Sequence, residues 1–443
     1  MFSSISAVFK LPSLRNRILF TLAMLAIYRL GIFIPSPGID RDALSEFFSS
    51  SQGSLLSLYN MFSGGALERF SVFVLGIMPY ISASIIMQLA QVIFPKIERL
   101  KSEGQAGRKK INQYTRYLTI GIAIVQSFTI SISLETMSTT SGTPIVLEGG
   151  WWFTLMTVIT MTSGSCFVMW LGEQITERGI GQGASLIITA GIIAAIPSGA
   201  QSLYQNMALG EISLLSITLL LLFMCLVVAA IVYVERGLYQ VPIRFPKRVG
   251  VGGAQAGGQN THLPLKVNVA GVIPPIFASS LMFFPATIST LFPNDFFQLL
   301  SSVFIPGTWT YLVSYIFLIV AFTFFYAAIT FNPTDLADNL RKQGGFIPNV
   351  RPGPDTVAKL DYILIRLTAG GAVYLSVVCI LPEVLAQRYN IPFYFGGTGL
   401  LIIVGVCMHT VAQIEGYMLS QQYDGLESQK KGGGRREKFS IQR

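Results

Sequence analysis

Residues 212–234 read ISLLSITLLLLFMCLVVAAIVYV, a run of 23 residues without a charge that is bounded by Glu211 and Glu235. An α-helix needs about 20 predominantly apolar residues to cross the hydrocarbon core of a bilayer. The run therefore predicts a membrane-spanning helix, and it determines how the rest of the chain is interpreted.

The composition extends this interpretation to the whole chain. Of its 443 residues, 12% are charged and 51% are hydrophobic, and the mean hydropathy is +0.57. Soluble domains carry about 25% charged residues, so these values exclude a disordered chain and argue against an ordinary soluble enzyme. The net charge of +9 is typical of a membrane protein with basic cytoplasmic loops. We predict a polytopic membrane protein.

Ten runs of suitable length and apolarity occur along the chain. They cover residues 18–34, 71–94, 118–134, 151–171, 184–204, 212–234, 267–292, 311–331, 367–381 and 394–411. The charge-poor loop at 197–211 divides them into two sets of five, and an odd number of spans per half places the halves in opposite orientations. The predicted fold is an all-α polytopic membrane protein with ten transmembrane helices in two inverted five-helix halves, 1–205 and 206–420, and a flexible cytoplasmic tail at 421–443.

Basic residues are unevenly distributed over the loops between these spans. Loops on one side, together with both termini, hold 27 of the 31 Lys and Arg residues, and the opposite side holds three. Basic loops face the cytoplasm, so we expect both termini to be cytoplasmic. The two longest loops, 235–266 and 332–366, lie on this side. Such charge usually marks a solvated face, but loops of this length also suit docking to a cytosolic partner, with anionic lipid or RNA as candidate surfaces.

The segment 55–94 departs from the simple pattern because its 40 residues are far more than one span needs. Its first part, 55–62, covers only about 12 Å as a helix, and Gly64 and Gly65 separate it from the full span. A short helix joined in this way predicts a re-entrant element, which is tolerated at membrane depth only inside protein or beside a cavity. The alternative is an amphipathic helix that lies on the outer surface.

Motifs of catalysis and cofactor binding are absent from the sequence. It contains no G-x-x-x-x-G-K-[ST], no H-E-x-x-H and no C-x-x-C, and the glycines at 179–183 predict a tight cytoplasmic turn rather than a phosphate site. Ionisable residues inside spans mark ion or proton pathways, but here the spans hold almost none, with Arg29 the main exception. A passive conduit without a cofactor is therefore favoured over an ion-coupled transporter, and an intramembrane hydrolase ranks third.

Several longer motifs resemble the SecY/Sec61-alpha family of protein-conducting channel subunits. They occur in order at 59–67 (YNMFSGGAL), 75–85 (LGIMPYISASI), 170–181 (WLGEQITERGIG), 261–268 (THLPLKVN), 270–274 (AGVIP), 331–333 (FNP), 337–340 (ADNL) and 392–398 (PFYFGGT). The resemblance implies a non-enzymatic channel of the cytoplasmic (inner) membrane. Such a channel translocates unfolded secretory polypeptides across the membrane and releases membrane-protein segments laterally into it.

The resemblance also implies two parts of the pore. A plug at about 55–69 seals the outer vestibule and includes Asn60, Met61, Phe62, Ser63, Gly64 and Gly65. A ring of apolar side chains forms the waist and corresponds to Ile77, Ile81, Ile188, Ile276 and Ile402. Ile77 and Ile81 are four residues apart and share one helix face. An apolar constriction excludes water and ions by dewetting and does not bind the side chains that pass it.

Further residues correspond to the family's lateral gate and docking loops. The resemblance implies a gate between spans 2 and 3 and spans 7 and 8, with Ser82, Gln126 and Asn268, and it implies docking through Lys247, Arg248 and Arg351. The implied partners are the subunits SecE and SecG, the motor ATPase SecA, the ribosome, signal sequences, nascent polypeptides and anionic lipids, without direct DNA binding. Residues 249–254 read VGVGGA where the family often carries arginines, so ribosome contact is expected to be weaker there or to rest on the second loop.

Overall fold

The computed structural model describes residues 11–40, 43–44, 60, 63–136, 144–147, 149–210, 213–245, 248–249, 255–256, 260–291, 308–389 and 397–437. Most of these residues are helical. The long helices are α2 (Pro12–Gly31), α5 (Met78–Ile93), α7 (Gln105–Thr136), α8 (Trp151–Arg178), α9 (Gly183–Ala208), α10 (Leu214–Glu235), α11 (Ile273–Leu291), α13 (Trp309–Thr330), α15 (Pro354–Tyr389) and α16 (Gly397–Glu437). The short elements are α6 (Pro95–Ser102), β1 (Leu238–Arg244), β2 (Arg248–Val249), β3 (Gln255–Ala256), β4 (Asn260–Lys266) and α14 (Pro333–Lys342).

Each of the ten predicted spans overlaps one of the long helices. Among the described residues, seven helices are individually long and apolar enough to cross a membrane, and eight are if α5 and α6 count as one bent span. The predominantly helical multi-pass architecture is thus confirmed, whereas the count of ten spans stays a prediction.

Helix α5 starts later than the predicted span and ends in a sharp break. The span was expected from residue 71, but the helix begins at Met78, because Phe70 and Gly76 have positive φ angles of 42° and 54° that interrupt a helix. At the other end, Phe94 is extended, as expected for a residue before a proline. The axis turns there by 104° into the charged helix α6.

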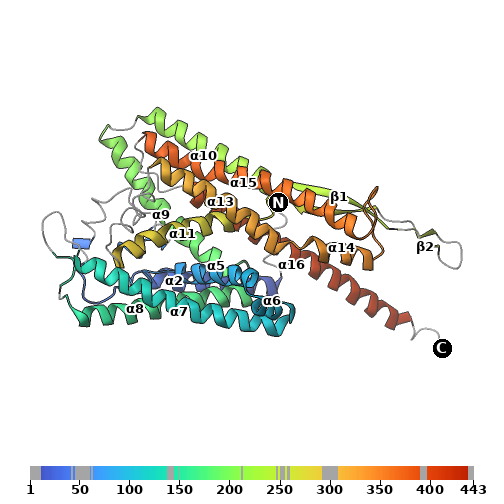
Figure 1. Ribbon diagram of the computed structural model, residues 1–443, viewed down its shortest axis with the longest axis horizontal. Helices are drawn as coiled ribbons and strands as arrows, with labels where there is room; N and C mark the ends of the chain where they lie inside the picture. The colour runs from blue at the N-terminus through green and yellow to red at the C-terminus, as the bar shows by residue number, and fades with distance from the viewer. Residues whose placement is uncertain are drawn as a thin grey trace.

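The helices form two groups that meet in the middle of the molecule (Figure 1). In the first group, α7 packs against α5 and α8, and α2 packs against α8 and α9; in the second, α13 packs against α11 and α15. Helix α11 contacts α5 and α7 of the first group, and α16 contacts α9, α10 and α15. One buried apolar cluster draws residues from both groups.

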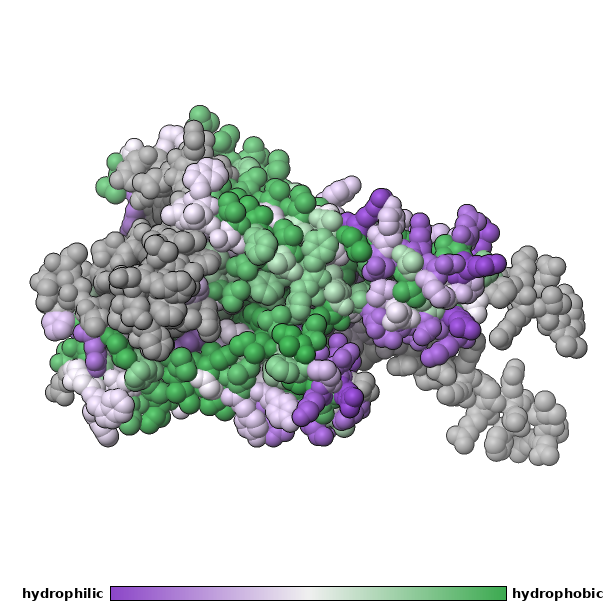
Figure 2. All heavy atoms as spheres, in the orientation of Figure 1, coloured by the Kyte–Doolittle hydropathy of each residue, from purple (hydrophilic) through white to green (hydrophobic). Residues whose placement is uncertain are grey.

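The surface is consistent with a membrane-embedded body. Figure 2 shows hydrophobic residues across the middle of the visible face and hydrophilic residues gathered at the end that carries β1 and α14. Trp151, Trp152 and Trp309, at the starts of α8 and α13, are each more than 70% exposed. Tryptophan is enriched at membrane–water interfaces, so these residues mark the interface at the end opposite the hydrophilic one.

The two longest loops, 235–266 and 332–366, fold together into one unit, which the all-α prediction did not include. Strands β1 and β4 pair antiparallel from Leu238↔Lys266 to Arg244↔Asn260, and Arg244 exchanges both backbone hydrogen bonds with Phe346 of the second loop. Apolar residues from both loops pack beneath the hairpin: Val241, Leu265, Ala337, Ile347 and Leu360. We call this unit the loop body.

The last two long helices extend beyond their predicted spans. Helix α15 covers 354–389 rather than 367–381, and α16 continues to Glu437. Residues 421–437, which we expected in a flexible tail, therefore belong to a helix; this stretch contains no proline to end it. Residues 438–443 lie outside the described residues.

Candidate functional site

The five isoleucines of the predicted ring are brought together by four helices. Ile77 is the residue before α5 and Ile81 lies in its first turn, while the others lie on α9, α11 and α16. All five are at most 5% exposed and belong to one buried cluster: Ile77, Ile81, Ile188, Ile276 and Ile402. The cluster joins residues separated by more than 300 positions in the sequence, and it lies where the two helix groups meet.

A close helix contact places Ile187, the neighbour of Ile188 in α9, beside the same glycine as Ile77. A Cβ atom on Gly183 would collide with the backbone carbonyl of Gly172 in α8, so α9 can start against α8 only with glycine at this position. A Cβ on Gly172 would in turn lie 3.3 Å from Cδ1 of Ile77. The glycine-rich stretch at 179–183, predicted as a turn, thus has a packing role beside the ring.

The described part of the predicted plug is tied to α2. The Tyr28 hydroxyl donates to the carbonyl of Ser63 at 3.1 Å, and the Arg29 guanidinium donates to the carbonyl of Gly64 at 3.0 Å. Gly64 has φ +72°, and a Cβ there would lie 2.9 Å from the Cα of Gly191 in α9. Arg29, the one conspicuous charge in a predicted span, therefore has a structural partner that the sequence did not reveal.

Hydrogen bonds within the segment close it into a compact loop. The Asn60 side chain accepts from the backbone N–H of Glu68 at 3.1 Å, and the Asn60 carbonyl accepts from the N–H of Gly65 at 2.9 Å. Ser63 and Phe70 are each 1% exposed, so this part of the chain lies inside the protein. Met61, Phe62 and residues 55–59 lie outside the described residues, and the choice between a plug and a surface helix for them stays open.

The predicted gate residues are not paired with one another. Asn268 donates to Oε1 of Glu235 at 2.7 Å and exchanges hydrogen bonds with the backbone of Gly271 at 3.1 Å. In contrast, Oε1 of Gln126 on α7 is buried and has no partner among the described residues. Asn268 is satisfied within its own half because Glu235, at the end of α10, lies beside it. Ser82 is partly buried on α5.

The two halves meet along two seams of different chemistry. We call the contact of α5 with α11 the front seam, and the contact of α16 with the 179–183 turn and the start of α2 the back seam. At the front seam, α11 packs against α5, and the Ser280 hydroxyl lies 4.0 Å from the sulfur of Met78. At the back seam, the backbone N–H of Gly181 donates to Oε1 of Gln413 on α16 at 2.8 Å.

The back seam has a second polar contact at the start of α2. The Arg17 guanidinium donates to the Tyr417 hydroxyl at 3.2 Å and lies 5.1 Å from the centre of its ring. No sequence motif pointed to this contact, because its two residues are 400 positions apart.

Two of the three predicted docking residues, Arg248 and Arg351, lie at the hydrophilic end. Arg351 is exposed, and its carbonyl accepts from the Thr356 hydroxyl at 2.8 Å, which fixes the loop before α15. Arg248 lies in β2, which pairs with β3 as a small hairpin beyond β1 (Figure 1). Lys247 lies outside the described residues.

Comparisons with known proteins agree along nearly the whole chain. The model of the SecY family matches residues 71–411. The protein translocase subunit SecY of Aquifex aeolicus (strain VF5) is 46% identical over 420 residues, which cover 95% of this chain and 98% of the relative. The protein translocase subunit SecY of Escherichia coli (strain K12) is 44% identical over 431 residues, which cover 96% and 97%.

Solved structures share the fold at low sequence identity. A protein-conducting channel matches with a TM-score of 0.63 and 18% identity, over 91% of this chain and 92% of that one. Sec61 in a canine ribosome–channel complex from the endoplasmic reticulum matches with a TM-score of 0.59 and 17% identity, over the same shares of the two chains.

Proposed function

The chain belongs to the SecY family, and from this premise we propose that it is the protein-conducting channel subunit of a translocase. It is a multi-pass membrane protein whose role is to let unfolded secretory polypeptides cross the membrane and to release membrane-protein segments laterally. The named relatives are protein translocase subunits, and the solved structures of the same fold include protein-conducting channels.

The observation that carries this proposal is the buried apolar cluster, with residues from both halves, to which all five isoleucines belong. Isoleucine has no hydrogen-bonding group, so a constriction of such side chains lets any polypeptide side chain slide past without specific binding. The same surface excludes water and ions by dewetting when no polypeptide is present. An ion-coupled transporter needs an ionisable site at the bilayer midplane, and the residues at this junction are apolar instead.

The ring and the front seam give the channel two directions of exit. Passage through the ring leads across the membrane, whereas separation of α5 from α11 at the front seam opens a path into lipid. The segment at about 55–69 acts as the plug, which leaves when the hydrogen bonds of Ser63 and Gly64 to Tyr28 and Arg29 break. Gln126 keeps its role as a gate residue, because its unpartnered Oε1 can accept from a polar group that enters the gate.

The partners and the orientation follow from the family and the charge distribution. We assign SecE and SecG as accompanying subunits, SecA and the ribosome as sources of driving force, and the cytoplasmic membrane as the location, with both termini cytoplasmic. A solved Sec61 of the same fold is part of a ribosome–channel complex. The exposed loop that carries Arg351 is the proposed docking surface.

The role of Arg351 has a direct test. Arg351→Glu should abolish SecA-driven translocation in reconstituted vesicles because it reverses one exposed charge of the docking surface. Assembly with the accompanying subunits, measured by co-purification, should stay intact. Normal translocation by this variant would refute the assignment.

The channel function itself is tested with an arrested secretory chain. Single cysteines at the five ring positions, in a background without the four native cysteines, should crosslink to a polypeptide stalled in transit. A cysteine in place of Ile159, which is 56% exposed on α8, serves as the lipid-facing control and should not crosslink. Equal labelling at the ring and at residue 159, or none at the ring, would reject a polypeptide path and favour a small-solute carrier.

A further inference from the structure

Glu235, at the end of α10, has no part in the proposed function. Its side chain is half-buried, and Oε1 accepts a hydrogen bond of 2.7 Å from Nδ2 of Asn268. Asn268 is 3% exposed and lies in the turn between β4 and α11. The contact therefore joins the end of α10 to the start of α11, the helix that forms one side of the front seam.

Two further hydrogen bonds fix the side chain of Asn268 to its own segment. Its Nδ2 donates to the carbonyl of Gly271, and its Oδ1 accepts from the N–H of Gly271, both at 3.1 Å. One residue earlier, the N–H of Val267 donates to the carbonyl of Gly237 at 3.0 Å and extends the ladder of β1 and β4. Asn268 therefore moves with the start of α11, and its bond to Glu235 is the link that such a movement breaks.

Helix α15 brings a second hydrogen-bond donor to the same carboxylate. A Cβ on Gly371 would lie 3.7 Å from Oδ1 of Asn268, so this face of α15 packs against the contact. Tyr374 follows three residues later on the same face, and the charge of Glu235 acts on it. The Tyr374 hydroxyl is buried and has no hydrogen-bond partner among the described residues. Because such a hydroxyl costs free energy, its position beside a carboxylate indicates a second arrangement in which it donates to Glu235.

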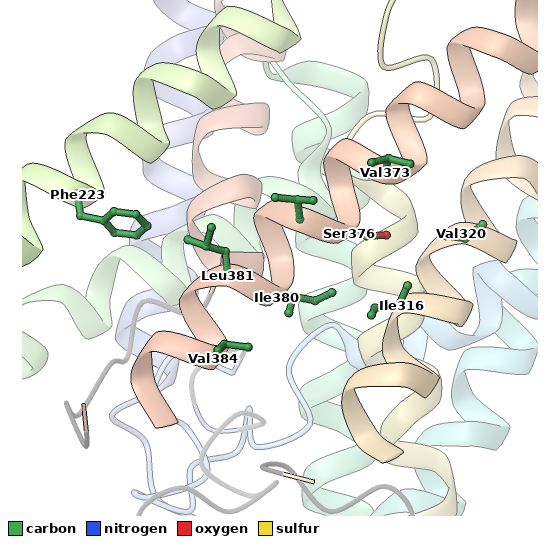
Figure 3. Close-up of a pocket in the computed structure, with 9 residues that line it drawn as sticks. Phe223, Ile316, Val320, Val373, Ser376, Ile380, Leu381 and Val384 are labelled. Atoms are coloured by element: carbon green, nitrogen blue, oxygen red, sulfur yellow. The ribbon is translucent and has the colours of Figure 1, made fainter. Parts of the chain in front are cut away.

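The neighbouring face of α15 does not use this hydroxyl. It lines an apolar groove of about 650 Å³ between α10, α13 and α15, with Val373 and Val377 on its α15 side (Figure 3). The single hydroxyl in the groove, on Ser376, donates to the carbonyl of Ala372 at 2.8 Å. The groove side chains are therefore apolar or already satisfied, and the acceptor that lies near Tyr374 is Glu235.

Helix α11 can change its position when the front seam opens. In this structure it packs between α13 of its own half and α5 and α7 of the other half. Separation of the seam removes the contacts with α5 and α7, so α11 can settle further onto α13. Its start can turn at Gly271, which has φ +64° and where a Cβ would meet nothing within 4 Å. A turn at this residue draws Asn268 away from Glu235.

We propose that Glu235 holds the start of α11 in one of two positions, by accepting from Asn268 when the front seam is closed and from Tyr374 when it is open. A half-buried carboxylate that loses its donor is costly, so the second donor stabilises the shifted position of α11. Lys266 also acts on this carboxylate, but it is exposed on β4 and does not replace a buried donor. The proposal rests on the lateral exit given with the proposed function, and it adds the two donors that set the balance between the closed and open states.

Spin labels across the front seam measure both states. The full chain, with its accompanying subunits and without native cysteines, carries labels on Ile86→Cys in α5 and Leu281→Cys in α11, positions that are 41% and 43% exposed. Distances between the two labels are measured by electron paramagnetic resonance in vesicles, with and without an arrested secretory chain. The distance distribution gives the fraction of channels with a separated seam, and the readout involves no completed translocation.

The two donors should shift this fraction in opposite directions. Asn268→Ala should raise the separated fraction of the resting channel about tenfold, because it removes the bond of the closed state. Asn268→Asp, which keeps an acceptor for the N–H of Gly271 but faces Glu235 with a like charge, should raise it as well. Tyr374→Phe should lower the separated fraction with the arrested chain about tenfold, since its hydroxyl has a partner only in the open state. Glu235→Gln keeps an acceptor for both donors and should change either fraction by less than about twofold.

Two variants on α10 serve as matched controls. Tyr233→Phe removes a hydroxyl from a side chain that is 83% exposed, and Ser213→Ala removes a hydrogen bond at the opposite end of the helix from Glu235. Neither should shift the separated fraction. A fraction that Tyr374→Phe leaves unchanged or raises, or that Asn268→Ala does not raise, would overturn the proposal. If the unaltered seam never separates, the lateral exit fails together with this inference, whereas a seam that separates without the opposite shifts rejects the inference alone.

Discussion

The front seam between α5 and α11 is apolar, whereas the back seam, where α16 meets the 179–183 turn and the start of α2, is hydrogen-bonded. At the front, the polar contact observed is a hydroxyl–sulfur approach of 4.0 Å between Ser280 and Met78. At the back, Gln413 accepts from a backbone N–H at 2.8 Å and Arg17 bonds Tyr417 at 3.2 Å.

This difference indicates which side of the channel opens. An apolar seam can separate inside a bilayer because lipid chains solvate apolar side chains as well as a neighbouring helix does. Breaking the contact of Gly181 with Gln413 in the back seam would leave a buried N–H without its acceptor, which is costly. We therefore expect the halves to pivot about the back seam while the front seam opens, with the isoleucine ring between them.

The largest effect is expected when a polar group is placed in the ring. Ile276→Asn should raise the ion conductance of reconstituted channels by about tenfold or more, because an amide retains water in the constriction. Conductance is measured in planar bilayers without translocating polypeptide. Ile276→Leu, which keeps the apolar surface, is the control, and equal conductance of the two variants would contradict the role of the ring as the seal.

A smaller rise in ion leak is expected when the contact between Arg29 and the plug is removed. Arg29 lies near the end of α2, the helix whose start contributes Arg17 to the back seam. Arg29→Ala removes the hydrogen bond to Gly64, a contribution of about 1 kcal/mol, which corresponds to about fivefold in the population of the released plug. Ion leak should rise accordingly, and Arg29→Lys, which can still donate to the carbonyl, should leak less. If both variants leak like the unaltered chain, the contact does not hold the plug.

Thermal stability distinguishes the two seams. Gln413→Ala leaves the buried N–H of Gly181 without an acceptor and should cost about 1 to 3 kcal/mol. Ser280→Ala at the front seam should stay within about 0.5 kcal/mol. Thermal unfolding of the detergent-purified chain measures both. A larger loss for Ser280→Ala than for Gln413→Ala would reverse the assignment of the seams.

The sequence predicted the membrane architecture well because span length and apolarity are local properties. The run at 212–234 corresponds to α10, and the other predicted spans each overlap a long helix. Boundaries were less certain, since positive φ angles at Phe70 and Gly76 delay the start of α5. Nothing in the alternation of residues 238–244 was strong enough to predict that both long loops would fold into one loop body.

Contacts across the halves could not be derived from residue patterns. Only the spacing of Ile77 and Ile81 was informative by itself; the approach of the other three isoleucines depends on how four helices pack, and it entered through the family resemblance. Gln126 and Asn268, both predicted at the gate, do not hydrogen-bond to each other, because Asn268 donates to Glu235 instead. The contact of Arg17 with Tyr417 joins residues too distant in the chain for any local signal.

A disulfide across the front seam tests the central claim most directly. In a background without native cysteines, Met78→Cys with Ser280→Cys is oxidised in vesicles that contain the full translocase, and translocation of a secretory precursor is compared before and after reduction. As a matched control, a short bis-maleimide linker joins Arg17→Cys to Tyr417→Cys across the back seam. We predict that the front disulfide stops translocation until it is reduced, while the back linker leaves translocation intact. Full translocation through a channel with an oxidised front seam, or a block by the back linker alone, would contradict the account.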